Sequence, residues 1–145
     1  MLFKNILVPV DGSTASLQAV ASAVSLAKAY DGTVTAIYVI DPYPFTGVGT
    51  DFAYGQDQYL AAATAEANAA IRVAQEAIEA GGVKVVTRVV EAHTIWRGIL
   101  DAASALGSDI VVMGSHGRHG LEKLLGSVAQ RVVSHSHVPV LVVRD

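Results

Sequence analysis

The stretch GSHGRHGLEKLLGSVAQ, residues 114–130, combines residue types that can bind phosphate through the backbone. It holds four glycines, and a glycine lets a ligand come close to the main chain because it has no Cβ. The GxxxxGK[ST] spacing of a P-loop is absent, and no lysine stands directly before Ser127. A phosphate bound here would therefore be held by backbone N–H groups and the Ser127 hydroxyl. A glycine-rich turn that only joins a strand to a helix explains the spacing equally well.

A helix is predicted to begin at Ser127, because Ser127 and Gln130 have the S-x-x-Q spacing of a capping box. The N-terminus of a helix presents free N–H groups and a partial positive charge to an anion. Gly126 would let a phosphate reach those groups, and Gly114 and Gly117 would do the same near the sugar and the first phosphates.

Apolar runs and turn residues predict the elements that must position this stretch. Strands are expected over residues 5–10, 33–40, 84–90, 109–113 and 139–144, and helices near 17–27, over 58–80, over 95–106 and from 127 onward. Strands that are apolar on both faces and alternate with helices indicate a parallel sheet covered on both sides. The sequence therefore predicts an α/β fold in one domain, residues 1–145.

Helical spacing also predicts which side chains face the sheet. The buried faces of the first and last helices are expected to consist of Leu17, Val20, Ala21, Val24 and Ala27, and of Val128, Ala129, Val132 and Val133. Residues 41–57 are expected to form a long irregular loop, and such loops are often functional. Its aromatic side chains would cover either a bound base or a helix or partner subunit: Tyr43, Phe45, Phe52 and Tyr54.

Composition limits the class of protein. The chain has 145 residues, 52% of them hydrophobic, a net charge of −3 and no cysteine. This balance argues against a nucleic-acid partner and excludes disulfide or thiol chemistry. No apolar run reaches the roughly 18 residues of a membrane span, and the first 13 residues do not form a signal peptide. A cytoplasmic protein without a membrane partner is the default expectation.

Other polar residues give weaker signals. The five histidines do not show the arrangement of a zinc site, and no carboxylates are paired for acid–base catalysis. Ser127 has no evident histidine and aspartate partners, so it is interpreted as a binding residue and no catalytic residue is expected. Asp11 precedes Gly12 and would by itself be a turn residue. Trp96, between Ile95 and Ile99, is predicted to be a packing residue.

Taken together, these motifs resemble the ATP-binding universal stress proteins. Gly114-x2-Gly117 followed by Gly126-Ser127 is similar to the G-x2-G-x9-G-[ST] motif of that family, and the segments VPVDGS, YVID, MGSHGR, GSVAQRVV and VPVLVV match as well. The resemblance covers the whole chain. One departure is that residues 118–125 number eight where the usual motif has nine. The shorter segment either closes up within the loop or loosens the phosphate cradle.

The resemblance implies a Rossmann-like fold of the adenine nucleotide α-hydrolase type, with five parallel strands in the order 3-2-1-4-5. It implies that Asp11 contacts the nucleoside and that the backbone of Val39 offers hydrogen bonds to adenine. Further residues would line the nucleoside pocket or pack beside the base and ribose: Pro9, Val10, Met113 and Gly114.

For the phosphates, the resemblance implies backbone contacts, joined by the Ser127 hydroxyl, from Gly117, Gly126, Ser127 and Val128. His116 and Arg118 lie in the same loop and either touch phosphate or are solvated. The expected cofactor is ATP or a related adenine nucleotide. Mg²⁺ at the phosphates would offset their charge, although no metal ligands of the chain itself are expected.

The resulting expectation is a stress-response regulatory protein that signals its nucleotide occupancy to a protein partner the sequence does not name. Hydrolysis should be slow at most, because the sequence shows neither a general base nor an arginine finger. Two alternatives remain open: an interaction module that has lost nucleotide binding, and a phosphoryl- or nucleotidyl-transfer enzyme. A homodimer is expected through residues 139–143, an apolar strand at the sheet edge in the family order, because an unpaired apolar edge invites association.

Overall fold

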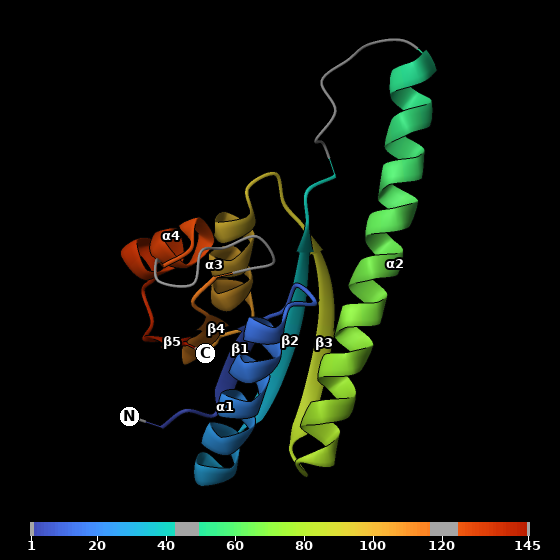
Figure 1. Cartoon of the computed structure of the whole chain (residues 1–145). Helices are drawn as coiled ribbons and strands as arrows, with labels where there is room; N and C mark the ends of the chain where they lie inside the picture. The colour runs from blue at the N-terminus through green and yellow to red at the C-terminus, as the bar shows by residue number, and fades with distance from the viewer. Residues whose placement is uncertain (1, 43–49, 117–124, 145) are drawn as a thin grey trace.

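The computed structural model of the chain describes residues 2–42, 50–116 and 125–144. Within these residues, strands and helices alternate along the sequence (Figure 1): β1 (Asn5–Pro9), α1 (Thr14–Tyr30), β2 (Thr33–Ile40), α2 (Thr50–Ala80), β3 (Lys84–Glu91), α3 (Ile95–Ala105), β4 (Ile110–Gly114), α4 (Ser127–His135) and β5 (Val140–Val143). All neighbouring strands are parallel, and their order is β3-β2-β1-β4-β5. The predicted fold class and strand order are therefore confirmed. None of the helices in the described part is both long and apolar enough to cross a membrane.

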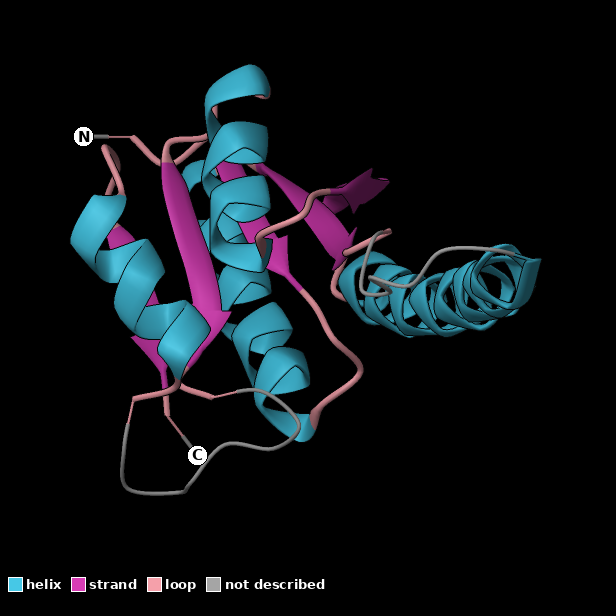
Figure 2. Ribbon diagram, turned by 90° about the horizontal axis from the view of Figure 1, so that it is seen from above, coloured by secondary structure: helices cyan, strands magenta, loops and turns pink. Residues whose placement is uncertain are grey.

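Helices cover both faces of the sheet, as Figure 2 shows from above. Side chains alternate across the strands, so that Ile6 and Val8 of β1 pack with α1 and α2, whereas Leu7 packs with α3 and α4. The same alternation holds in β4, where Val112 belongs to the first core and Met113 to the second. The central strands β1 and β4 are thus buried on both sides, which explains their nearly continuous apolar sequence.

The predicted buried face of α1 is partly wrong. Leu17 is 38% exposed and Ala21 is exposed, whereas the buried positions are mostly small: Ala15, Ser16, Ala19, Val20, Ala23 and Ala27. Small side chains allow α1 to lie close to the sheet, so the larger apolar residues are displaced to its flanks. In α4, Val133 is 48% exposed for a similar reason, because Ala129 and Val132 make the central contact.

Helix α2 begins eight residues earlier than predicted. It starts at Thr50 and not near Gln58, so Phe52 and Tyr54 belong to a helix and not to an irregular loop. Tyr43 and Phe45 lie outside the described residues. Thirty-one helical residues span about 46 Å, whereas the eight residues of β3 span roughly 26 Å. The N-terminal part of α2 consequently extends past the carboxyl ends of the strands (Figure 1).

A short turn at Asp31 and Gly32 connects the end of α1 to the start of β2. Asp31 adopts the left-handed conformation that caps the helix (φ 55°), and the Gly32 N–H donates to Ala27 O at 2.9 Å. Gly32 follows the cap directly, where a glycine often ends a helix. Gly32 is instead required by packing, since a Cβ would lie 2.8 Å from Phe3 O.

Candidate functional site

The carboxyl ends of β1 and β4 lie side by side in the middle of the sheet, with Leu7 of β1 beside Val111 of β4. The chain leaves β1 toward β2 on one side, whereas β4 and β5 lie on the other side. In open α/β sheets this reversal of strand order creates the crevice in which ligands bind. The predicted site residues in the described part of the chain gather along this edge, at the ends of β1, β2 and β4 and the start of α4: Pro9, Val10, Asp11, Val39, Met113, Gly114, His116, Gly126, Ser127 and Val128. Gly117 and Arg118 lie outside the described residues.

Asp11 is held by the turn that connects β1 to α1. Its Oδ1 accepts the Ser13 N–H at 2.9 Å, and Ser13 Oγ in turn accepts the Ser16 N–H at 3.1 Å, which caps α1. The buried Ser16 hydroxyl donates to Ser13 O at 2.9 Å, which adds a second hydrogen bond between Ser13 and Ser16 and stabilises the turn. Both serines were missed by sequence reasoning, although D-G-S before a helix is a cap pattern. This network fixes the carboxylate at the strand end and uses only one of its oxygens.

The backbone of Val39 points toward the space beyond β1. Thr33 N donates to Lys4 O, and Ile37 O accepts the Val10 N–H, so the odd-numbered residues of β2 direct their backbone groups toward β1. The last residue pair between the two strands is Pro9 with Ile37, and β2 continues for three more residues. The Val39 N–H and C=O therefore lie past the end of β1, where a flat polar group could bond to them.

Gly114 has a packing role that the sequence did not predict. A Cβ at this position would lie 2.9 Å from Ala15 Cβ and 3.1 Å from the Ala15 carbonyl carbon. The absence of a side chain thus allows the first turn of α1 to pack against the end of β4. The predicted contact of Gly114 with a ligand stays a prediction.

The start of α4 corrects the predicted capping box. The N-cap is Gly126 and Ser127 is the first helical residue, and no side chain in the described part of the chain caps the helix with a hydrogen bond. The first intrahelical bond runs from Gln130 N to Gly126 O at 2.9 Å, so the N–H groups of Ser127, Val128 and Ala129 precede it. Gln130 Nε2 instead donates to Leu125 O at 2.6 Å, which fixes the residue before the cap.

Gly126 is packed against the segment that follows β4. Its N–H donates to Ser115 O at 2.7 Å, and a Cβ would lie 3.1 Å from His116 Cα. This contact joins the start of α4 to the end of β4. The exposed Ser127 side chain and the half-buried Val128 follow directly.

A concave region lies farther along the carboxyl edge of the sheet, at the end of β3 and the start of α3. The open pocket has a volume of about 680 Å³ and is lined by Glu91, Ala92, His93, Thr94, Trp96, Arg97, Asp101 and Arg131. Trp96 stacks on His135 of α4, with ring centroids 4.5 Å apart, and packs against the core beneath α3 and α4. Its predicted role in packing is confirmed. Within the described ranges, no three histidine, aspartate or glutamate side chains are grouped so that they could hold a metal ion.

The fold defines a Rossmann-like α/β protein, and the described site residues predicted from the sequence lie at its β1–β4 switch point. The family model for universal stress proteins matches residues 2–144. Universal stress protein MJ0531 of Methanocaldococcus jannaschii is 39% identical over 144 residues, which covers 99% of this chain and 83% of that protein. The solved structure of universal stress protein UspA from Lactobacillus plantarum has a TM-score of 0.88 at 28% identity and covers 99% of both chains. The chain belongs to the universal stress protein family.

Two more distant structures share the fold and are described with ligands. One is a universal stress protein in complex with cAMP, with a TM-score of 0.72 and 24% identity, covering 99% of this chain and 98% of that one. The other is the universal stress protein from Archaeoglobus fulgidus in complex with dAMP, with a TM-score of 0.73 and 20% identity, covering 98% of both chains. At these identities the likeness establishes the fold alone.

Proposed function

We propose that this protein binds an adenine nucleotide, ATP first of all, in the crevice between the ends of β1 and β4, and that it signals nucleotide occupancy to a protein partner. The observation that carries the proposal is the start of α4, a helix N-terminus with no side-chain cap, placed beside the crevice and preceded by glycine. Backbone N–H groups at such a terminus bind phosphate without a lysine.

Each part of a nucleotide has a matching group at this edge. Asp11, braced by Ser13, keeps one carboxylate oxygen for the ribose hydroxyls. Val39 offers a backbone donor and acceptor to adenine, and the buried Met113 contributes an apolar surface. Complexes of two fold relatives with cAMP and dAMP agree with an adenine ligand.

The proposal includes the remaining predicted roles. Val10 and Pro9 line the nucleoside side, and Gly126, Ser127 and Val128 hold the phosphates together with Gly117, while His116 and Arg118 flank them. A Mg²⁺ ion would be held mainly by the phosphates themselves, since divalent magnesium is commonly bound through phosphate oxygens and water. Turnover of ATP should be slow at most, because the sequence shows neither a general base nor an arginine finger.

The Ser127 hydroxyl provides a direct test. Ser127→Ala should weaken ATP binding by roughly 10- to 100-fold, since a hydrogen bond to a charged group contributes about 1.5–3 kcal/mol. Because Ser127 is exposed and does not cap α4, the free energy of unfolding should change by less than about 0.5 kcal/mol. Calorimetric titration of ATP measures the first quantity, and urea unfolding measures the second.

A matched control is available in the same helix. Ser134→Ala removes an exposed hydroxyl near the other end of α4 and should leave ATP affinity unchanged. Equal affinity of wild type and Ser127→Ala would place the phosphates elsewhere. If the wild type binds no ATP, and no nucleotide is released from freshly purified protein, the shortened 118–125 segment has removed the site and the protein acts as an interaction module.

A further inference from the structure

Ser115 directly follows β4 and lies beneath the start of α4. Its N–H donates to Val143 O at 2.9 Å, so the residue continues the hydrogen-bond ladder between β4 and β5. Val111 and Met113 project toward α3 and α4, and the alternation along the strand places the Ser115 side chain on that same face. Ser115 O accepts the N–H of Gly126, the N-cap of α4, at 2.7 Å. The side chain therefore lies on the α4 face, next to the cap of that helix.

The Ser115 hydroxyl is buried and unsatisfied. The residue is 1% exposed, and its Oγ has no hydrogen-bond partner among the residues that the structure describes. A buried polar atom without a partner is unfavourable, and most native hydroxyls in such positions are bonded. The N–H groups of Ser127, Val128 and Ala129 precede the first intrahelical bond of α4. An unpartnered hydroxyl and an uncapped helix terminus thus occur on the same side of the sheet, joined by one backbone hydrogen bond.

We infer that the Ser115 hydroxyl is a ligand-binding group, which donates to a phosphate oxygen held at the N-terminus of α4. This inference rests on the proposed function and adds a residue to the phosphate site. A phosphate oxygen accepts several hydrogen bonds, so it can satisfy the backbone N–H groups and the hydroxyl together. The low dielectric around a buried hydroxyl strengthens such a bond when it forms.

The inference predicts opposite effects of one substitution on stability and on binding. In the ligand-free protein, Ser115→Ala removes an unsatisfied hydroxyl, so the midpoint of urea unfolding should stay the same or rise. In the bound state it removes a donor to a charged oxygen, so ATP affinity should fall by roughly 10- to 100-fold. Adenosine carries no phosphate, and its affinity should be the same for the variant and the wild type. A structural hydroxyl would have the reverse pattern, with lower stability and unchanged ATP affinity.

The experiment titrates ATP, adenosine and inorganic pyrophosphate into the wild type, Ser115→Ala and Ser108→Ala, and measures urea unfolding of each ligand-free protein. Ser108 is also buried but precedes the opposite end of β4, so its variant controls for loss of a buried serine hydroxyl. Loss of ATP and pyrophosphate affinity in Ser115→Ala, without loss of stability, supports the inference. Unchanged ATP affinity in Ser115→Ala overturns it while leaving the proposed function intact.

The pyrophosphate titration separates the two proposals further. If the wild type binds pyrophosphate but neither ATP nor adenosine, the nucleotide proposal fails, and the role of Ser115 is decided by whether its variant loses pyrophosphate. If the wild type binds none of the three, both proposals are wrong.

Discussion

At the scale of single residues, two glycines of the phosphate motif occupy positions where neighbouring atoms of the protein leave little room for a side chain. Gly114 faces Ala15 of α1, and Gly126 faces the backbone of Ser115 and His116. Glycine in this family motif therefore cannot be interpreted only as space for a ligand. Gly126→Val, an obvious test of the cradle, would also disturb the junction between β4 and α4, and for that reason Ser127→Ala is the better probe.

The contact between Gly114 and Ala15 gives a prediction about stability. Gly114→Ala places a Cβ 2.9 Å from Ala15 Cβ, so it should lower the free energy of unfolding by about 1–3 kcal/mol, as overpacked sites do. Adding Ala15→Gly should restore part of that loss, because it removes the atom that lies closest. Urea unfolding of both single variants and the double variant measures the coupling. A fully stable Gly114→Ala protein would show that α1 can shift away from β4 without cost.

At the scale of elements, α2 is divided into a packed part and a projecting part. Among the side chains that the structure describes in α2, Ala67 is the first that is buried, and Ala74 and Ile78 are completely covered by the sheet. Before Ala67, the described side chains from Asp57 onward are exposed or half-buried. The projecting part extends past the same edge of the sheet that carries the candidate site (Figure 1).

Hydrogen exchange should distinguish these two parts. Backbone amides of residues 57–66 are expected to exchange at least about 10-fold faster than those of residues 70–80, because local opening there exposes little apolar surface. Mass spectrometry of exchanged peptides measures both segments in one experiment. Uniform protection along α2 would mean that something covers its first turns. The same data with and without ATP would test whether residues 41–57 cover a bound base, since their exchange should then slow when ATP is added.

The elements differ in how far the sequence predicts them. The strand Thr33–Ile40 was correct to the residue and the other four to within one residue at each end, because strands inside a covered sheet have nearly continuous β-branched and apolar sequences. The start of α2 was missed, since Gly55 and aromatic residues reduce helix propensity without preventing a helix. The predicted contact face of α1 was partly wrong, because alanines make the closest contacts with the sheet and alanine gives only a weak hydrophobic signal in the sequence. The location of the candidate site at the carboxyl edge of the sheet could be predicted from the strand order. The packing of Gly114 against α1 and the burial of Ser115 could be seen only in the structure.

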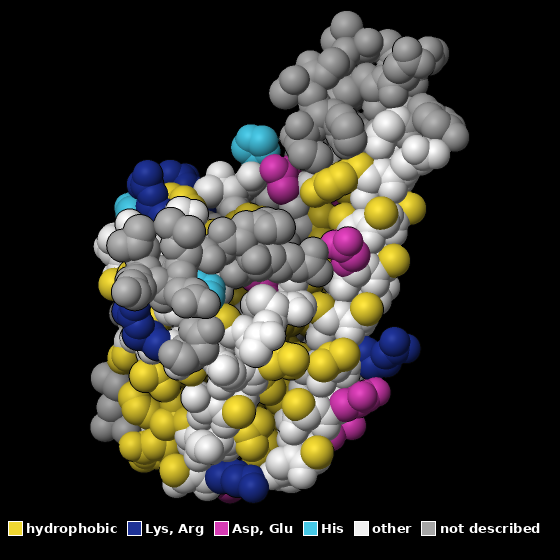
Figure 3. Space-filling view, in the orientation of Figure 1, with side chains coloured by type: hydrophobic (Ala, Val, Ile, Leu, Met, Phe, Trp, Pro, Cys, Tyr) yellow, Lys and Arg dark blue, Asp and Glu magenta, His cyan; other side chains and the backbone are white. Residues whose placement is uncertain are grey.

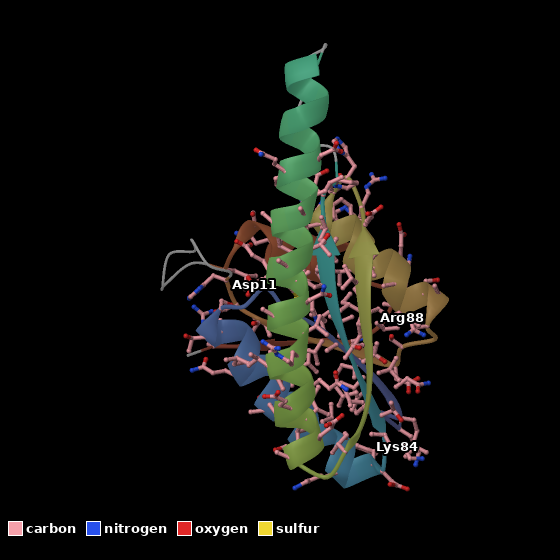
Figure 4. The ribbon with its side chains drawn as sticks, turned by 90° about the vertical axis from the view of Figure 1, so that its right-hand side faces the viewer. Asp11, Lys84 and Arg88 are labelled. Atoms are coloured by element: carbon pink, nitrogen blue, oxygen red, sulfur yellow. The ribbon has the colours of Figure 1, made fainter. Side chains whose placement is uncertain are left out.

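At the scale of the whole molecule, the two edges of the sheet differ in their suitability for pairing. On β3, Lys84 and Arg88 are exposed and project on the far side of the strand from α2 (Figure 4), and such charges discourage edge pairing. On β5, Leu141 is 42% exposed, and hydrophobic side chains form part of the surface where β5 and the N-terminus lie (Figure 3). Association is therefore expected at β5, in agreement with the predicted homodimer through residues 139–143.

The predicted dimer has a sharp test at the centre of β5. Antiparallel pairing of Val140–Leu141–Val142 with a second copy would bring the two Leu141 residues together at the two-fold axis. Leu141→Glu would place two like charges there, so the wild type should sediment as a dimer at micromolar concentration and the variant as a monomer. Val73→Glu is the matched control, because Val73 is 47% exposed but lies on α2. A wild type that is monomeric at this concentration, or a dimer unaffected by Leu141→Glu, would contradict the β5 interface.

The stacking of Trp96 on His135 gives the protein an optical reporter of its own. The chain contains one tryptophan, so its fluorescence comes from a single site at the contact between α3 and α4. Because His135 lies at the last residue of α4 and Ser127 at the first, a ligand that rotates or straightens this nine-residue helix would alter the ring stacking at its far end. The emission spectrum and its quenching would then follow events at the opposite end of the helix without any attached label. Replacing His135 with alanine would remove the stacked ring and show how much of the signal depends on it.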